Sequence, residues 1–426
     1  MKKLLILALL LCIAAVPFAT HATAQDEVTL TFLGGDWWFS EEGTSGVGGS
    51  HGYQMMQQYM EMHPEIKFDI QGVPFPDLDN TQVAALEAGQ GPDFMIVNSV
   101  TIGSFIDRGY IMPMDDLIAA SGLDTSVFYP SLFSAGVVQG HTFALPIDTG
   151  TRLLFWNKAM FAEKGLEPPT RWDQLLDVAT QMTDKENGVY GFVATSGERW
   201  VWLYEHAGMY STANGLDFVN PEATDCVLDQ GDNPQIIQFW VDMYNAGVMP
   251  EEDLMIGTGD ERYLEFGNNK AAMMLAGFWA APNLENDYNM VFPDDYGVLP
   301  LEGSAGIGSS TGGWLFALSR DAKHPKEAMD FMNWVLSTPD NLALFTNLMP
   351  STPAATEIAL PGDFYKPFDE VLASPNTRHP IPLNPGLPEQ AEILRNVTQS
   401  AFLGDMTAQE AAKSFCDQIQ GTLFEK

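Results

Sequence analysis

The sequence contains one string that could support nucleophilic catalysis, residues 308–312, which match the pattern G-x-S-x-G. In enzymes that use this pattern, a strand leads into the serine and a helix follows it, so that the turn exposes the nucleophile. Here a glycine-rich segment precedes Ser310, and a strand-forming run at 315–318 follows it. Because this context is reversed, we interpret the stretch as a flexible loop and not as a catalytic serine.

Other catalytic and metal-binding patterns find no match in the sequence. The seven histidines form no H-E-x-x-H, and Cys226 and Cys416 are too isolated for a zinc framework. The glycines of 43–52 are not followed by the lysine of a phosphate-binding loop. Among 56 acidic residues some pair could always be proposed as the acid and base of a glycosidase, so such a pair carries no weight. The sequence therefore predicts a protein that is not an enzyme and needs no metal or cofactor.

Tryptophans close to predicted strand ends indicate instead that the chain binds a ring-shaped, uncharged molecule. A sugar ring presents an apolar C–H face and a rim of hydroxyls, so it needs a flat aromatic side chain and polar groups around it. Hydrogen bonds to charged groups contribute about 1.5 to 3 kcal/mol each when water is excluded. The aromatic candidates are Trp37, Trp38, Trp200, Trp279 and Trp314. The polar and backbone candidates are Asp36, Asn98, Ser99, Asp148, Arg152 and Gly313.

Most of these candidates also have a structural explanation that competes with ligand contact. Arg152 could simply pair with a neighbouring acid. Trp200 and Trp202 would point to opposite sides of an extended segment, so only one of them would face a ligand. Packing beneath a loop is the alternative for Trp37, Trp38 and Trp314. Four other tryptophans occupy positions expected in the core: Trp156, Trp172, Trp240 and Trp334.

The first elements that must position these residues alternate between strand and helix. Apolar strands are predicted at 28–32, 66–70 and 94–97, with helices near 53–63 and 82–88 between them. This order predicts a parallel sheet covered by helices on both faces. Ligands of such sheets lie beyond the carboxyl ends of the strands. The rule directs attention to three short segments: 36–38, 72–73 and 98–99.

A second group of elements lies in residues 140–183. An apolar, strand-like run is broken at Pro146, and a polar joint at 148–150 leads into a second strand at 153–156. The joint therefore lies between two sheet-forming runs, where one lobe could pass the chain to another.

Two helices are predicted to follow this second strand. The first begins near Asn157 and ends at Gly165. The second is opened by Thr170, with Asp173 three residues later as a capping box. Its apolar residues keep helical spacing, so one face of this helix should pack on a sheet.

This stretch resembles the first crossover of the maltose-binding-protein-like bacterial extracellular solute-binding proteins (family 1), which serve sugar ABC transporters. The family pattern is G-x-x-Y-A-L-P…L-x-Y-N-K…F…G-L…P-P-x-T-W-x-E-L. Its counterparts here are Gly140, Phe143, Leu145, Pro146, Leu154, Asn157, Lys158, Phe161, Gly165, Leu166, Pro169, Trp172, Asp173 and Leu175. Further motifs resemble the family at 266–280, 297–300 and 348–353 and occur in the family's order.

The resemblance implies an α/β fold of two lobes, each a mostly parallel sheet flanked by helices, joined by three hinge crossovers. The crossovers are expected near 148–151, 299–302 and 350–352. The first lobe would comprise 25–147 and 303–349, and the second 152–298 and 353–426.

The resemblance also implies a function. The chain would be a monomeric periplasmic substrate-binding protein that captures a neutral mono- or oligosaccharide between its lobes. Closure would then present it to the membrane permease subunits of an ABC importer. Trp279 aligns with the family's sugar-stacking tryptophan. The same fold binding a glycerophosphodiester is an alternative, which would require Arg152, Arg199 or Arg378 to converge. A secreted glycoside-acting enzyme is another.

The first 24 residues have the form of a secretory signal peptide. Two lysines precede an apolar run, and Ala22-Thr23-Ala24 forms the exit, which predicts cleavage before Gln25 and a periplasmic protein. The chain carries a formal net charge of −36, and loss of the leader's two lysines makes it −38. A field of this sign repels nucleic acid. In an exported chain Cys226 and Cys416 could form a disulfide, but the sequence alone leaves their pairing open.

Overall fold

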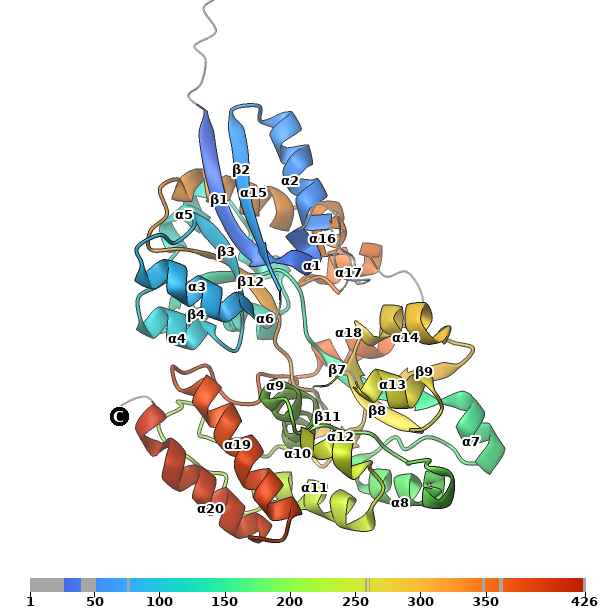
Figure 1. Cartoon of the computed structure of the whole chain (residues 1–426). Coiled ribbons are helices and arrows are strands. Elements are labelled where there is room, and N and C mark those ends of the chain that lie inside the picture. The colour runs from blue at the N-terminus through green and yellow to red at the C-terminus, as the bar shows by residue number, and fades with distance from the viewer. Residues whose placement is uncertain are drawn as a thin grey trace, which may run out of the picture.

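The computed structural model describes residues 27–39, 51–74, 77–256, 259, 261–346, 349–359 and 363–423. The predicted signal peptide lies outside these residues. The chain forms two α/β lobes, one above the other in Figure 1, with the connecting segments near the middle of the molecule. The predicted two-lobed α/β fold is therefore confirmed. Within the described residues, no helix is both long enough and apolar enough to cross a membrane.

The first lobe is built on a five-stranded sheet in the order β2-β1-β3-β12-β6. Its strands are β1 (Val28–Gly35), β2 (Ile66–Val73), β3 (Phe94–Asn98), β6 (Ala144–Pro146) and β12 (Trp314–Leu318). The pairs β1–β2 and β1–β3 are parallel, whereas β12 runs antiparallel to both β3 and β6. β12 therefore returns to the first lobe from far along the chain and inserts between two early strands.

Helices cover both sides of this sheet. They are α1 (Asp36–Phe39), α2 (His51–Met62), α3 (Leu78–Glu87), α4 (Ile102–Asp107), α5 (Asp115–Ser121), α6 (Pro130–Ser134), α15 (Pro325–Leu336), α16 (Pro339–Thr346) and α17 (Pro353–Ala359). Phe331 and Met332 of α15 are fully buried in one hydrophobic cluster with Phe94 and Phe316 of the sheet. The strand–helix alternation predicted for the first hundred residues is confirmed.

The second lobe contains a three-stranded sheet in the order β8-β7-β9. Its strands are β7 (Arg152–Asn157), β8 (Met273–Gly277) and β9 (Tyr296–Leu299), and both pairings are antiparallel. The expectation of a mostly parallel sheet is therefore wrong for these strands. Isolated parallel bridges at the side of the sheet join Tyr190 to Ala271 and Val193 to Met274. An apolar run predicts that a strand exists but does not fix its direction.

The helices of the second lobe surround this sheet. They are α7 (Lys158–Lys164), α8 (Trp172–Met182), α9 (Arg199–Val201), α10 (Met209–Asn214), α11 (Gln235–Ala246), α12 (Glu251–Ile256), α13 (Glu261–Gly267), α14 (Ala280–Tyr288), α18 (Lys366–Ala373), α19 (Leu387–Phe402) and α20 (Ala408–Ile419). A π-helical segment, η4 (Trp202–Gly208), joins α9 to α10. Trp172, Trp202 and Trp240 are buried in the core of this lobe.

Two predicted helix ends can be compared with the structure. α7 ends at Gly165 in the left-handed conformation with φ +64°, as the sequence predicts. The capping box predicted at Thr170 is wrong, because α8 begins at Trp172 with Arg171 as its N-cap. Instead, the backbone N–H of Thr170 donates to Oε1 of Gln174 at 3.0 Å, which links Thr170 to the first turn of α8.

Two short hairpins complete the described strands: β4 (Val137–Val138) with β5 (His141–Thr142), and β10 (Glu302–Gly303) with β11 (Gly306–Ile307). The second hairpin lies on the second lobe. The N–H of Glu302 donates to the carbonyl of Thr170 at 2.9 Å, and the N–H of Ser304 donates to Oδ1 of Asn214 at 3.0 Å. The chain enters the first sheet again only at Trp314.

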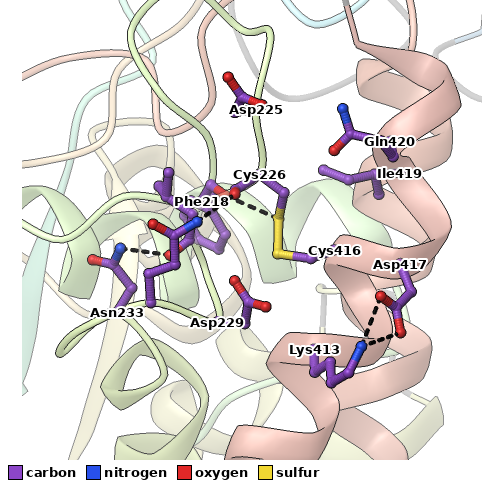
Figure 2. The surroundings of a disulfide bond; sticks show 12 residues. Phe218, Asp225, Cys226, Asp229, Asn233, Lys413, Cys416, Asp417, Ile419 and Gln420 are labelled. Carbon is purple, nitrogen blue, oxygen red and sulfur yellow. Dashed lines mark hydrogen bonds and ion pairs between the residues drawn. A yellow bond between two sulfur atoms is a disulfide. The ribbon is translucent and has the colours of Figure 1, made fainter.

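Cys226 and Cys416 form a disulfide with a Cα–Cα distance of 5.3 Å. Figure 2 shows the bond between an irregular segment of the second lobe and α20, near Phe218 and Ile419. The sequence left this pairing open. Because the two cysteines are 190 residues apart, the bond closes a large loop, which includes β12 and α15–α17 of the first lobe.

Candidate functional site

Three chain segments are hydrogen-bonded together where the two lobes join. Oδ1 of Asp148 accepts from the N–H of Trp314 at 2.6 Å. The next two residues also bond to other segments, since the N–H of Thr149 donates to the carbonyl of Met349 and that of Gly150 to the carbonyl of Gly312. The junction named here, residues 148–152, 309–314 and 349–352, thus brings three distant parts of the chain into one hydrogen-bonded unit.

A triangle of buried hydroxyls reinforces this junction. Oγ1 of Thr149 lies 2.9 Å from Oγ1 of Thr151, and Oγ1 of Thr311 lies 3.3 Å from both. All three side chains are buried. The sequence analysis did not identify this triangle, because isolated threonines form no spacing pattern. Its role is structural, since it satisfies buried polar groups that would otherwise destabilise the fold.

Ser99, just beyond the carboxyl end of β3, lies beside Gly313, which immediately precedes β12. The N–H of Gly313 donates to Oγ of Ser99 at 3.2 Å, and the N–H of Ser99 donates to the carbonyl of Gly313 at 2.9 Å. Gly313 has φ +153°, and a Cβ there would lie 2.5 Å from the carbonyl oxygen of Asp148. A glycine is therefore required where these two segments approach each other.

Ser99 also links the first lobe to a buried tyrosine of the second. Its hydroxyl is hydrogen-bonded to the phenol of Tyr204, whose own hydroxyl contacts Nε2 of His379. Nδ1 of His379 faces the carbonyl of Ile381, which can only accept a hydrogen bond, so we assign the proton to Nδ1. Burial lowers the pKa of His379 to about 4, so this ring is neutral at pH 7. The hydroxyl of Ser99 then donates to the oxygen of Tyr204, and the hydroxyl of Tyr204 donates to Nε2 of His379.

Trp38 and Trp314 form an aromatic pair on the first lobe. Their ring centroids are 6.5 Å apart at an interplanar angle of 72°. Trp38 is 1% exposed, which favours packing beneath the loop over ligand contact. Trp314 is half-buried and lies opposite Asn98 in the register of β12 and β3. Asp36, at the start of α1, is also half-buried, whereas the side chain of Trp37 lies outside the described residues.

Trp279 and Arg152 lie together on the second lobe, beside the junction. The guanidinium carbon of Arg152 is 5.1 Å from the Trp279 ring centroid and 4.9 Å from that of Tyr204. Nε1 of Trp279 donates to the hydroxyl of Tyr263 at 2.9 Å, and the tryptophan is half-buried. Burial lowers the pKa of Arg152 to about 10, which still leaves it charged at pH 7. A charged donor therefore adjoins a partly exposed aromatic ring.

Arg152 adjoins a buried ion pair between Glu205 and Arg262. Nε of Arg152 lies 4.0 Å from Oε1 of Glu205, and Glu205 also pairs with Arg262. The side chains of Glu205 and Arg262 are 4% and 3% exposed. Arg262 donates further to the carbonyl of Gly259 at 2.7 Å and to that of Leu275 at 2.9 Å. The sequence analysis missed Glu205 and Arg262; the only available signal was a charged residue within a strongly apolar run.

The segment that carries Trp200 is helical and not extended, so the predicted alternation of Trp200 and Trp202 is wrong. Trp202 is fully buried and packs against Trp240 and Phe402, each at 5.6 Å. Trp200 is half-buried and lies 5.0 Å from the guanidinium of Arg199. Of the pair, only Trp200 has substantial exposure.

The G-x-S-x-G string forms part of the junction. The hydroxyl of Ser310 donates to the carbonyl of Tyr204, and that of Ser309 donates to the carbonyl of Arg152 at 2.8 Å. Both serines are fully buried. The stretch is thus a bonded connection and not the free loop expected, and Ser310 is directed at a backbone carbonyl, which cannot act as a general base.

Each of the three arginines that could converge on an anion lies beside a different acidic residue. Arg152 adjoins Glu205, Arg199 lies 3.8 Å from Glu392, and Arg378 lies 2.6 Å from Asp217. Nη2 of Arg378 also donates to the carbonyl of Leu216 at 3.0 Å. This arrangement does not gather positive charge at one place. In the described residues, no group of three or more His, Cys, Asp or Glu side chains could hold a metal ion.

Comparison with known proteins shows which family the sequence matches. The family model for bacterial extracellular solute-binding proteins matches residues 45–341. The sn-glycerol-3-phosphate-binding periplasmic protein UgpB of Pectobacterium atrosepticum is 25% identical to the chain, over 78% of each protein. The UgpB protein of Escherichia coli is also 25% identical, over 93% of each.

Solved structures share the fold at lower identity. An ABC transporter solute-binding protein from Thermotoga lettingae, bound to α-D-tagatose, superposes with a TM-score of 0.76 at 23% identity, covering 92% of this chain and 99% of that one. The GacH receptor of Streptomyces glaucescens, studied without ligand and with acarbose, superposes with a TM-score of 0.77 at 21% identity, covering 94% and 100%. The two-lobed arrangement of Figure 1 is therefore that of solved solute-binding proteins.

Proposed function

We propose, from the premise that this chain belongs to the bacterial extracellular solute-binding protein family, that it captures a neutral mono- or oligosaccharide between its two lobes. It would then deliver the sugar to the membrane permease subunits of an ABC importer. The predicted signal peptide would bring the chain to the periplasm, where it would act as a monomer.

The observation that carries this proposal is the position of Trp279 beside Arg152. A half-buried indole adjoins a charged donor at 5.1 Å, and both lie at the junction that leads to the first lobe. A sugar ring fits such a pair, because its C–H face can stack on the indole while its hydroxyls accept from the guanidinium. Trp314 is a second half-buried indole, at the first residue of β12 in the first lobe.

The predicted site residues divide into two groups by exposure and bonding. We assign ligand contact to the side chains that remain partly exposed: Asp36, Asn98, Arg152, Trp200, Trp279 and Trp314. Ser99, Asp148 and Gly313 are bonded within the junction, so we assign them the positioning of the lobes. Trp38 would support Trp314 from beneath.

The junction would act as the hinge. We place the first crossover at 148–151, as the sequence suggests. For the third we favour a position beyond Ala359 over the predicted 350–352, because Ala355 of α17 is still buried in the hydrophobic core of the first lobe. For the second we favour 308–313 over the predicted 299–302, because residues 302–304 are still hydrogen-bonded to the second lobe. Closure about these segments is stabilised when a ligand contacts both lobes and so binds the closed state more tightly.

A glycerophosphodiester is the second candidate ligand, and the names of the UgpB relatives favour it. A phosphate needs several cations at one place. Arg152, Arg199 and Arg378 are instead each paired with a separate acid, which supports the neutral sugar. A glycoside-acting enzyme has less support, since the family and the superposed structures are binding proteins.

Titration calorimetry of the mature protein against sugars, sugar alcohols and sn-glycerol 3-phosphate would test the proposal. We expect saturable binding of at least one neutral sugar, and Trp279→Ala should weaken that binding by about 1 to 3 kcal/mol. Binding of the phosphate ester alone would refute the sugar assignment. Incubation with labelled oligosaccharides, followed by analysis for cleavage products, would separate a binder from an enzyme.

A further inference from the structure

Gly277, the last residue of β8, lies directly beneath the indole of Trp279. A Cβ placed on Gly277 would lie 2.0, 2.2 and 2.4 Å from Cζ3, Cη2 and Cε3 of Trp279, and no other atom would be nearer. Real Cβ atoms do not approach other atoms this closely, so a side chain at 277 and the observed ring position exclude each other.

The backbone of Gly277 gives no other reason for a glycine. Its φ lies outside the left-handed region, unlike that of Gly313. In a β-strand with ordinary dihedrals, glycine is less favourable than a residue with a side chain. The requirement therefore comes from the indole and not from the chain path.

The position of Gly277 also explains why Trp279 reaches Arg152. The two strands are antiparallel, and Gly277 is the register partner of Arg152. Side chains of register partners project from the same face of a sheet. Because Gly277 leaves its side of that face empty, the indole can fold back over it, next to the guanidinium, with its N–H bonded to Tyr263.

We propose that Gly277 is a positioning residue of the sugar site: it makes no ligand contact but sets the orientation in which Trp279 meets the ring of the ligand. This inference rests on the proposed function for its effect on binding. The steric dependence between Gly277 and Trp279 does not require a ligand, so it can be tested separately.

The same sheet offers a matched control. A Cβ on Gly297 of β9 would lie 2.3 Å from Nε1 and 2.5 Å from Cε2 of Trp156, so Gly297 also lies under an indole. Trp156 is four residues farther along β7 than Arg152, away from the junction. Gly297→Ala therefore imposes a comparable steric change without altering the proposed site.

The experiment compares Gly277→Ala, Gly297→Ala, Trp279→Ala and the double variant Gly277→Ala/Trp279→Ala in thermal unfolding and in calorimetry with the sugar that binds. We expect Gly277→Ala to weaken binding by about tenfold or more, as Trp279→Ala does. Gly297→Ala should lower the melting temperature but leave the Kd at its wild-type value. In the double variant the added methyl should cause no further loss of affinity or stability, because the ring that it would strike is absent.

Two results would overturn the inference. One is a wild-type Kd for Gly277→Ala, and the other is additive losses of melting temperature in the double variant. If no sugar binds the wild-type protein, the proposed function fails, but the melting temperatures of the four variants still decide whether Gly277 fixes the position of Trp279.

Discussion

At the scale of single residues, the junction depends on a buried carboxyl whose charge is disfavoured. Burial raises the pKa of Asp148 from its usual value near 3.8 to about 7, against the hydrogen bond from the N–H of Trp314 and the charge of Arg152, which lower it. The raised pKa means that the folded protein keeps a proton that the unfolded chain releases near pH 4. Asp148 therefore makes the fold sensitive to pH.

This protonation has a predictable sign. Between about pH 4 and 7 the folded state binds more protons at Asp148, so its contribution to stability falls as pH rises and is lost above pH 7. The full loss is about 4 kcal/mol at most. Asp148→Asn keeps an oxygen to accept from Trp314 but cannot ionise, so its free energy of unfolding should fall less between pH 5 and pH 8. Denaturant unfolding of both proteins at these pH values measures the difference, and identical pH dependence would contradict the prediction.

The ion pair of Arg262 and Glu205 gives a second prediction at this scale. Removing one member of a buried pair typically costs about 3 to 5 kcal/mol, and Arg152, at 4.0 Å from Glu205, would compensate only part of the remaining charge. Arg262→Met should therefore destabilise the protein strongly, while Arg262→Met with Glu205→Gln should recover part of the loss. Denaturant unfolding of the two single variants and the double variant gives the coupling. A double variant as unstable as the sum of the singles would show that the two side chains do not act as a pair.

At the scale of elements, the disulfide anchors α20 to the irregular segment around Cys226. Closing a loop of 190 residues stabilises the folded state chiefly by restricting the unfolded chain, with typical effects of about 2 to 5 kcal/mol. Cys226→Ser with Cys416→Ser should lower the melting temperature. The Kd for ligand should stay near the wild-type value, because both cysteines lie in the hydrophobic core of the second lobe and neither belongs to the junction. An unchanged melting temperature, or a large loss of affinity, would contradict this expectation.

The elements that the sequence predicts well are those whose signals are local. The end of α7 at Gly165 follows from a glycine, which readily adopts the left-handed conformation, and β3 follows from the apolar run at 94–97. Strand direction in the second lobe and the partners of Glu205 depend on residues distant in the chain, so no spacing pattern encodes them. The aromatic segment after Glu198 was wrongly predicted to be extended. It is helical, and the carboxylate of Glu198 caps the helix by accepting from the N–H groups of Trp200 and Val201.

At the scale of the whole molecule, the two lobes also meet outside the junction. α4 of the first lobe approaches a loop of the second, and a Cβ on Gly103 would lie 2.6 Å from the carbonyl oxygen of Asn384. Val100, just before α4, packs in the hydrophobic core of the second lobe. On the side of α18, the hydroxyl of Tyr129 donates to Oδ1 of Asp369 at 3.0 Å. The arrangement of the lobes in Figure 1 is thus supported by direct contacts between them.

The contact at Gly103 predicts how closure could be weakened without touching the ligand. The atoms that a Cβ on Gly103 would strike are backbone atoms of Asn384. Backbone cannot move aside as a flexible side chain would, so Gly103→Ala should hold the lobes apart. Overpacking of this kind costs about 1 to 3 kcal/mol. A hinge motion that separates the lobes removes the clash, so the cost falls on the closed state and weakens ligand binding by the same amount. Calorimetry would measure the Kd, and small-angle X-ray scattering the radius of gyration with ligand.

Gly421→Ala is the matched control for this change, because a Cβ there would meet no atom within 4 Å. We expect Gly421→Ala to bind and to close as the wild type does, while Gly103→Ala binds more weakly and needs more ligand to reach the compact form. Equal affinity and equal compaction in the two variants would show that α4 and the loop at Asn384 do not meet when the lobes close. In that case closure would depend on the junction, the ligand and the other contacts between the lobes.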